Sequence, residues 1–352
     1  MNDVKFRSTK EDALVSLGAL LSSYADLQTQ YTSRVHMPDF RTFSDTWESS
    51  LYLPIRNEIT AVLKSRTFVV GDSLLYCAPG PHTPLLRNVG DGGIAVCFDT
   101  ITLLDIDDEA LRSAKQLLSL QDLSAKIDIA ALDLSGPFGQ RLCETYLAAL
   151  RSAETAEQVA KHLAPAHSLA SSIFSDVEQV LAQLTERFDT ITGGRRYNCL
   201  LSEMIASFTG TAVWLAFRSA LYERFASKAP LEELDACLSA GTLLWQLYNE
   251  HFLSFHLDFL RGQTERDGFI VLVFDTCKVY DLAALSSLPA LRQDTFVLDA
   301  LKSRQLQIAR QKTLCWRDHP NGFDVNLYGI PVSDFQAHTH DVELYFLEAA
   351  SS

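Results

Sequence analysis

The stretch SLLYCAPGPH, from Ser73 to His82, marks the change from a helical pattern to a strand pattern along this chain. Its first residues form a short apolar run, which is typical of a strand buried on both faces of a sheet. Pro79 and Gly80 then interrupt the run and indicate a loop. The sequence therefore predicts a buried strand, followed by a loop in which Gly80 lets a ligand approach the backbone.

Further short runs that are apolar or β-branched follow at intervals. They are DTITLLDI (Asp99 to Ile106), KIDIAALD (Lys126 to Asp133), FDTITG (Phe188 to Gly193) and GFIVLVFD (Gly268 to Asp275). Helical patterns lie between them, such as DEALRSAKQLLSL after the second strand. Strands that alternate with helices predict βαβ units, and hence an α/β fold with a doubly wound, mostly parallel sheet.

The remaining segments complete the predicted architecture. Apolar residues recur three and four apart before the first strand, which predicts an N-terminal helical cap over 1–66. The second unit, 67–350, is expected to be Rossmann-like and to carry a helical insertion over 197–264. The runs KTLCWRDH (Lys312 to His319) and DVELYFLEA (Asp341 to Ala349) alternate as strands do, and bring the expected total to seven strands.

Composition narrows the class of protein. Hydrophobic residues make up 47% of the 352 residues and charged residues 21%, as in folded globular chains. The net charge of −14 argues against nucleic acid as a partner. The seven cysteines stand singly without a CxxC pair, which is typical of a protein in a reducing compartment. The N-terminus shows no signal-peptide pattern, and no apolar run is long enough for a membrane span. We therefore expect a cytoplasmic protein with no membrane contact, and a homodimer remains possible.

Several common active-site motifs are missing from the sequence. It contains no GxSxG, no GxxxxGK[ST] and no HExxH, so hydrolase and kinase chemistry has no support. His338 and His340 flank a threonine, but a third and a fourth ligand are not evident, and we predict no metal site.

Polar residues follow the predicted strands where a ligand would be expected. In an open parallel sheet, ligands bind outside the carboxyl ends of the strands. Asp105 ends the second strand and can accept hydrogen bonds from ribose hydroxyls. Asp133 and Leu134 follow the third, where a carboxylate and an apolar neighbour could contact adenine. Gly193 ends the expected fourth strand, so these ends together predict a nucleoside pocket.

The order of elements and these strand-end residues resemble the class I S-adenosylmethionine-dependent methyltransferases. The resemblance implies a cofactor, S-adenosylmethionine, and a seven-stranded sheet that closes with an antiparallel final strand. It covers the architecture from about Ser73 to Leu347. The cofactor contacts that it implies are Ala78, Gly80 and His82 in the loop, Asp105 and Ile106 at the ribose, Asp133 and Leu134 at the adenine, and Gly193.

A second group of residues is expected to meet the methyl acceptor. Arg195 and Arg196 follow two glycines, and a guanidinium group could pair with a carboxylate of the substrate. Tyr197 comes next and joins them as a substrate contact. If the reaction needs a general base, His82 or Tyr197 could supply it. The expected substrate is a small or medium-sized molecule enclosed by the helical segments.

The loop departs from the family pattern at three positions. Tyr76, Ala78 and His82 stand where an acidic residue, a glycine and a second glycine are expected. Three alternatives therefore stay open. The first is a non-catalytic scaffold, the second is an oxidoreductase that uses NAD(P), although GxGxxG is absent, and the third is a transferase that releases methylthioadenosine.

Overall fold

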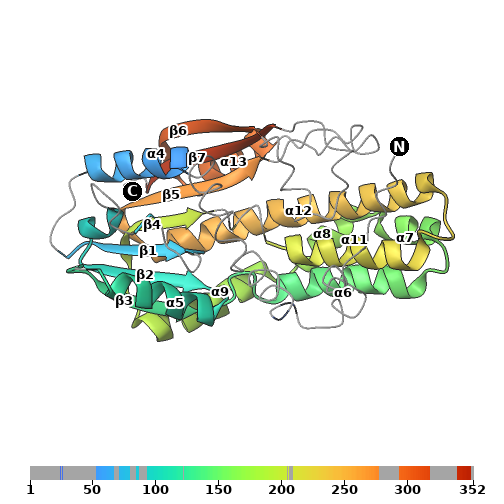
Figure 1. Cartoon of the computed structure of the whole chain (residues 1–352), viewed down its shortest axis with the longest axis horizontal. Coiled ribbons are helices and arrows are strands. Elements are labelled where there is room, and N and C mark those ends of the chain that lie inside the picture. The colour runs from blue at the N-terminus through green and yellow to red at the C-terminus, as the bar shows by residue number, and fades with distance from the viewer. Residues whose placement is uncertain are drawn as a thin grey trace, which may run out of the picture.

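The computed structural model describes Tyr24, Asp26 and residues 53–66, 71–79, 85–86, 93–121, 123–203, 205, 209–276, 293–317 and 339–349. Its centre is a seven-stranded sheet (Figure 1). The strands are β1 (Ser73–Cys77), β2 (Thr100–Asp105), β3 (Lys126–Ala131), β4 (Tyr197–Glu203), β5 (Thr264–Thr276), β6 (Leu306–Arg317) and β7 (Thr339–Ala349).

The strand order across the sheet is β3-β2-β1-β4-β5-β7-β6. Strands β1 to β5 pair in parallel, whereas β7 runs antiparallel to both of its neighbours, β5 and β6. The mostly parallel sheet and its antiparallel last strand confirm the predicted fold class, a Rossmann-like methyltransferase fold. Within the runs expected at 312–319 and 341–349, the described residues 312–317 and 341–349 are strands, and β6 begins earlier than expected, at Leu306.

Helices cover both faces of the sheet. One face packs against α4 (Leu53–Ser65) and α5 (Asp108–Ser119), with side chains such as Ile59 and Leu111 fully buried. The other face packs against a larger apolar core that contains residues of the helices between β3 and β6. These helices are α6 (Pro137–Ser152), α7 (Ala156–Leu163), α8 (Ala166–Ile173), α9 (Val177–Thr192), α11 (Thr211–Phe225), α12 (Leu231–Gln263) and α13 (Gln293–Ser303).

Several of these helices extend the molecule beyond the sheet. Figure 1 shows α6, α7, α8 and α11 gathered at one side of the strands, with α12 running from them back to the sheet. Because α12 has 33 residues, its length is about 50 Å at 1.5 Å per residue. The single helix therefore ties this helical block to the strands.

One predicted strand is wrong. Residues 188–192 form the last turns of α9, and Gly193 ends that helix in the left-handed conformation, at φ 70°. The fourth strand is instead Tyr197–Glu203, so the predicted insertion 197–264 begins with a strand and its helices start at Thr211. Gly193 is thus a helix C-cap, for which glycine is favoured because it has no Cβ.

Other expectations are only partly covered by the described residues. Within the predicted cap 1–66, the structure describes α4 together with Tyr24 and Asp26. The basic stretch 304–312 lies mostly in β6, where Arg310 and Lys312 pair with Glu58. Among the described residues, none of the helices is long and apolar enough to cross a membrane.

Candidate functional site

The carboxyl ends of four parallel strands lie together at one edge of the sheet. The register places Cys77 of β1 beside Leu104 of β2 and beside Ser202 of β4. Asp105 is opposite Ala131 of β3. The chain winds outward from β1 through β2 to β3 and then returns to the other side of β1 as β4. The gap between β1 and β4 is therefore the topological switch point, at which open α/β sheets bind ligands.

Asp105 lies at this edge, at the end of β2. One oxygen of its carboxylate accepts a hydrogen bond from the backbone N–H of Asp107 at 3.1 Å, which orients the side chain. Asp107 has a different role, because its Oδ1 accepts from the N–H groups of Glu109 and Ala110, at 3.0 Å each, and so caps α5. Ile106 between them is partly buried against the core.

Asp133 lies two residues beyond the end of β3. Its Oδ1 accepts hydrogen bonds from the backbone N–H of Ser135 at 2.8 Å and from the Ser135 hydroxyl at 2.6 Å. Burial raises the pKa of Asp133, and the hydrogen bonds from Ser135 counteract only part of this effect. Leu134 is buried in the apolar core. The structure thus places a partly desolvated carboxyl group and an apolar side chain at the position predicted for adenine.

The loop after β1 begins with a strained residue. Ala78 has φ 55°, in the left-handed region that favours glycine, and its N–H donates a hydrogen bond to the carbonyl oxygen of Leu104 at 2.8 Å. This conformation costs an alanine about 1–2 kcal/mol. The backbone therefore keeps a glycine-like turn at the position where the family pattern has a glycine. Gly80 and His82 lie outside the described residues.

Two polar pairs at the switch point were missed in the sequence analysis. The hydroxyl of Tyr76 in β1 donates a hydrogen bond to the carboxylate of Glu203, the last residue of β4. Ser202 Oγ lies 2.7 Å from Nε2 of His256 in α12, and both residues are buried. The partners are 127 and 54 residues apart, so no local pattern connects them. Only a correct assignment of the run YNCLLSE as a strand could have indicated Ser202 and Glu203.

His256 is neutral in this environment. It is 1% exposed, and burial lowers its pKa from 6.5 to about 3. Its ring also stacks on Phe252 of the same helix, with the ring centres 5.7 Å apart. An uncharged imidazole therefore lies between α12 and the end of β4.

The predicted substrate group lies at the opposite edge of the sheet. Arg195, Arg196 and Tyr197 stand at or before the start of β4, whereas Asp105 and Asp133 are at or beyond the carboxyl ends of their strands. Because β1 to β4 are parallel, the two sets of residues are separated by the length of the strands. The structure does not bring them together, and the error follows from the wrong position predicted for the fourth strand.

Each of these residues has a partner close to it in the structure. Arg195 pairs with Asp128 of β3 at 3.1 Å, and Arg196 pairs with Asp189 of α9 at 2.8 Å. The hydroxyl of Tyr197 donates a hydrogen bond to Thr102 Oγ1 at 3.0 Å, and the side chain is fully buried. These contacts hold α9, β2, β3 and β4 together.

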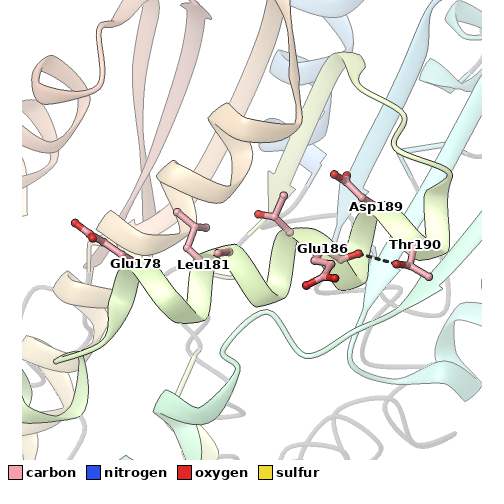
Figure 2. Close-up of a pocket in the computed structure, with 7 residues that line it drawn as sticks. Glu178, Leu181, Glu186, Asp189 and Thr190 are labelled. Carbon is pink, nitrogen blue, oxygen red and sulfur yellow. Dashed lines mark hydrogen bonds between the residues drawn. The ribbon is translucent and has the colours of Figure 1, made fainter.

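A hollow also runs along the surface of α9 (Figure 2). All of its lining residues belong to this one helix: Glu178, Leu181, Ala182, Thr185, Glu186, Asp189 and Thr190. The Thr190 hydroxyl donates a hydrogen bond to the carbonyl oxygen of Glu186 at 2.8 Å, which is an ordinary contact within a helix. Side chains of a single exposed helix do not converge on a ligand, and we assign this hollow no role.

The antiparallel β7 decides the type of fold. The fold is that of the class I methyltransferases.

Solved structures with a similar fold include a magnesium protoporphyrin IX methyltransferase from Synechocystis. It is 9% identical in sequence, with 94% of this chain and 98% of that chain covered and a TM-score of 0.41. The N-methyltransferase NodS from Bradyrhizobium japonicum is 9% identical, with 84% and 97% covered and a TM-score of 0.34.

A cyclopropane synthase from Mycobacterium tuberculosis is 10% identical, with 99% of this chain and 100% of that chain covered and a TM-score of 0.40. No family model and no curated protein matches the sequence. Likenesses at this level concern the fold only and assign no residue a function. The roles of the strand-end residues must therefore be argued from their own geometry.

Proposed function

We propose that this protein binds S-adenosylmethionine at the carboxyl edge of the sheet and transfers its methyl group to a small or medium-sized acceptor. The observation that carries the proposal is the position of Asp105 and Asp133, which follow adjacent strands next to the switch point. In such sheets a carboxylate after the second strand binds the ribose of a nucleotide. The carboxyl group after the third strand is then available to the adenine amino group.

The described residues fit this cofactor. Asp105 would accept hydrogen bonds from the ribose hydroxyls, while Asp133 and Leu134 would contact the adenine. Ala78, at the start of the loop after β1, keeps the left-handed backbone conformation that the glycine of the family pattern would adopt. S-adenosylmethionine supplies an activated methyl group on its sulfonium sulfur. The protein then has to bind and orient the two reactants and exclude water.

The helical block supports an acceptor of limited size. Its side of α12 carries a buried aromatic cluster, in which Tyr248 lies 5.3 Å from Phe174 and packs near Phe252. The hydroxyl of Tyr248 is buried close to the side chains of Ser135 and Asp133. The aromatic cluster therefore borders the end of β3, where it would limit the size of the acceptor.

The sheet order disfavours the nicotinamide alternative. Dinucleotide-binding sheets have the order 3-2-1-4-5-6 with parallel strands. Here β7 is inserted between β5 and β6 and runs antiparallel to both. A scaffold that no longer binds the cofactor remains as a second candidate, because alanine has replaced glycine at a position whose backbone favours glycine.

Calorimetric titration of the purified chain with S-adenosylmethionine, S-adenosylhomocysteine and NADH separates these candidates. The proposal predicts that the first two ligands bind and that NADH does not. Binding of NADH alone would favour an oxidoreductase. If no ligand binds, the scaffold is the better account. A transferase that releases methylthioadenosine would be recognised from the products formed with S-adenosylmethionine.

A further inference from the structure

Two tryptophan rings stack where the helical block meets the carboxyl edge of the sheet. Trp214 of α11 and Trp245 of α12 have ring centres 5.2 Å apart, with 21° between the ring planes. The backbone N–H of Trp214 donates to the carbonyl oxygen of Gly210 at 2.9 Å, one helical turn earlier. On α12, Tyr248 follows Trp245 by about one turn, and a Cβ at Gly210 would lie 3.1 Å from its Cε1. Because the Tyr248 hydroxyl is close to Asp133, the stacked pair lies next to the proposed nucleoside site.

Two polar atoms beside this stack are buried without a partner. Nε1 of Trp245 donates to the side-chain oxygen of Asn249 at 3.3 Å, with the amide oriented so that its nitrogen donates to Thr209. Trp214 is 6% exposed, and within the described ranges neither its Nε1 nor Oγ1 of Thr242 has a hydrogen-bond partner. Thr242 precedes Trp245 by three residues, so both lie on one face of α12. Since buried polar groups normally have partners, these two atoms indicate a place where a ligand supplies them.

The positive charge of Arg218 lies beside the same rings. Its guanidinium carbon is 5.9 Å from the ring centre of Trp214 and 5.9 Å from that of Tyr222, one helical turn to either side on α11. Burial lowers the pKa of Arg218 and the contact with the Tyr222 hydroxyl counteracts this effect, but an arginine stays charged at neutral pH. Indole N–H and guanidinium groups only donate hydrogen bonds. A ligand group that contacts both must therefore be an acceptor, and a negatively charged acceptor forms the stronger hydrogen bonds.

The ring surface beside these donors suits a flat aromatic ligand. Trp245 is only partly buried and Tyr222 is 37% exposed, so the rings can be reached from the surface. A further aromatic ring that stacks on Trp245 would extend the existing pair in the offset arrangement that such rings prefer. An aliphatic ligand of the same charge would lack this contact.

We propose that Trp214, Arg218 and Trp245 bind the methyl acceptor, and that this acceptor is a planar aromatic molecule with a carboxylate or phenolate group. Its ring stacks on Trp245, and the oxygen atoms of its acidic group accept hydrogen bonds from Trp214 Nε1 and from Arg218. This inference rests on the proposed function and names the substrate class of that site.

The test compares three probe molecules by calorimetry on the full chain, with saturating S-adenosylhomocysteine. 2-Naphthoate has the ring and the charge, naphthalene-2-carboxamide keeps the ring without the charge, and decahydro-2-naphthoate keeps the charge without the aromatic ring. We expect 2-naphthoate to bind about tenfold or more tightly than the amide, as is typical for a hydrogen bond to a charged group. It should bind about threefold or more tightly than the saturated acid.

Each residue should control one of these preferences. Arg218→Gln should abolish the preference for 2-naphthoate over the amide, and Trp245→Leu should abolish the preference over the saturated acid. Trp214→Phe keeps a ring in the stack and removes the N–H, so it should weaken 2-naphthoate but not the amide. Affinity for S-adenosylhomocysteine should stay at the wild-type value in all three variants, which also shows that they are folded.

The matched control is Arg112→Gln. This arginine is exposed on α5 and pairs with Asp108, so its replacement should change neither preference.

Failure of this inference can be distinguished from failure of the proposed function. If the wild-type chain binds S-adenosylhomocysteine but not 2-naphthoate, or if Arg218→Gln and Trp245→Leu leave both preferences unchanged, the acceptor site is overturned and the cofactor site stands. If the wild-type chain does not bind S-adenosylhomocysteine, the proposed function fails, and the role of these residues in binding a methyl acceptor fails with it.

Discussion

Ala78 has a backbone conformation that is sterically unfavourable for alanine. Its φ of 55° is one that glycine adopts without steric cost. Replacing Ala78 by glycine should therefore raise the free energy of unfolding by about 0.5–1 kcal/mol, because relief of strain exceeds the extra entropy of the unfolded chain. Urea denaturation at neutral pH measures this difference.

An alanine in a regular helix serves as the control for Ala78→Gly, because it shows whether the increase in the free energy of unfolding depends on the left-handed conformation. Ala148 lies on the exposed side of α6 in a regular helix. Its replacement by glycine should lower stability by about 0.5–1 kcal/mol. If Ala78→Gly were also destabilising, the strain argument at the loop would be wrong.

His256 should make the stability of the protein depend on pH. Its pKa is about 3 in the folded chain, compared with 6.5 for the unperturbed group. Below pH 6.5 the unfolded state therefore binds a proton that the folded state does not, and stability falls as the pH is lowered towards 3. This single group contributes a slope of up to about 1.4 kcal/mol per pH unit.

The change His256→Gln should flatten that slope by one proton, as measured by urea denaturation at several values between pH 7 and pH 4.5. Equal slopes in the wild-type chain and in His256→Gln would show that the imidazole is not held neutral.

At the scale of elements, the contact between α11 and α12 depends on a glycine. A Cβ at Gly241 would lie 2.5 Å from Cε1 of Phe217, and the Tyr146 hydroxyl of α6 donates to the carbonyl oxygen of Gly241 at 2.7 Å. Three helices thus meet at this residue. Gly241→Ala should cost about 1–3 kcal/mol of stability through overpacking.

Gly262, in the last turn of the same helix, provides the matched control. No atom lies within 4 Å of the position of its Cβ. Gly262→Ala should therefore be neutral or stabilise the protein by up to about 1 kcal/mol, since alanine is the better helix former. Chemical unfolding of both variants tests the close packing in the helical block, and equal effects would contradict it.

The elements also show how far local patterns were sufficient. β1, β2, β3 and β5 were predicted because each contains a short apolar or β-branched run in the sequence. The fourth strand was misplaced because Thr190, Ile191 and Thr192 are β-branched, yet they complete the last turn of α9. Packing of Val180, Leu184 and Phe188 on the core outweighs the local preference in these residues.

At the scale of the whole molecule, the site depends on which edge of the sheet each residue reaches. Asp105 and Asp133 come at or after the ends of adjacent strands, β2 and β3, and both strands were assigned correctly from the sequence. The fourth strand was predicted at 188–193 but is Tyr197–Glu203, so Arg195 and Arg196 lie at the opposite edge from the predicted site. It also hid Ser202 and Glu203, whose partners are distant in the sequence. Pairing across the sheet is thus the information that the sequence alone did not provide.

The central claim is that S-adenosylmethionine binds at the carboxyl edge of this sheet. The most direct measurement is a calorimetric titration of S-adenosylhomocysteine into the wild-type chain, Asp105→Asn and Asp128→Asn. The two carboxylates lie on adjacent strands, but Asp128 is opposite Thr102 in the middle of β2 and pairs with Arg195, whereas Asp105 ends β2. Our account predicts binding to the wild-type chain, about tenfold or greater weakening in Asp105→Asn and no change in Asp128→Asn. Absence of binding to the wild-type chain, or equal weakening in both variants, would contradict it.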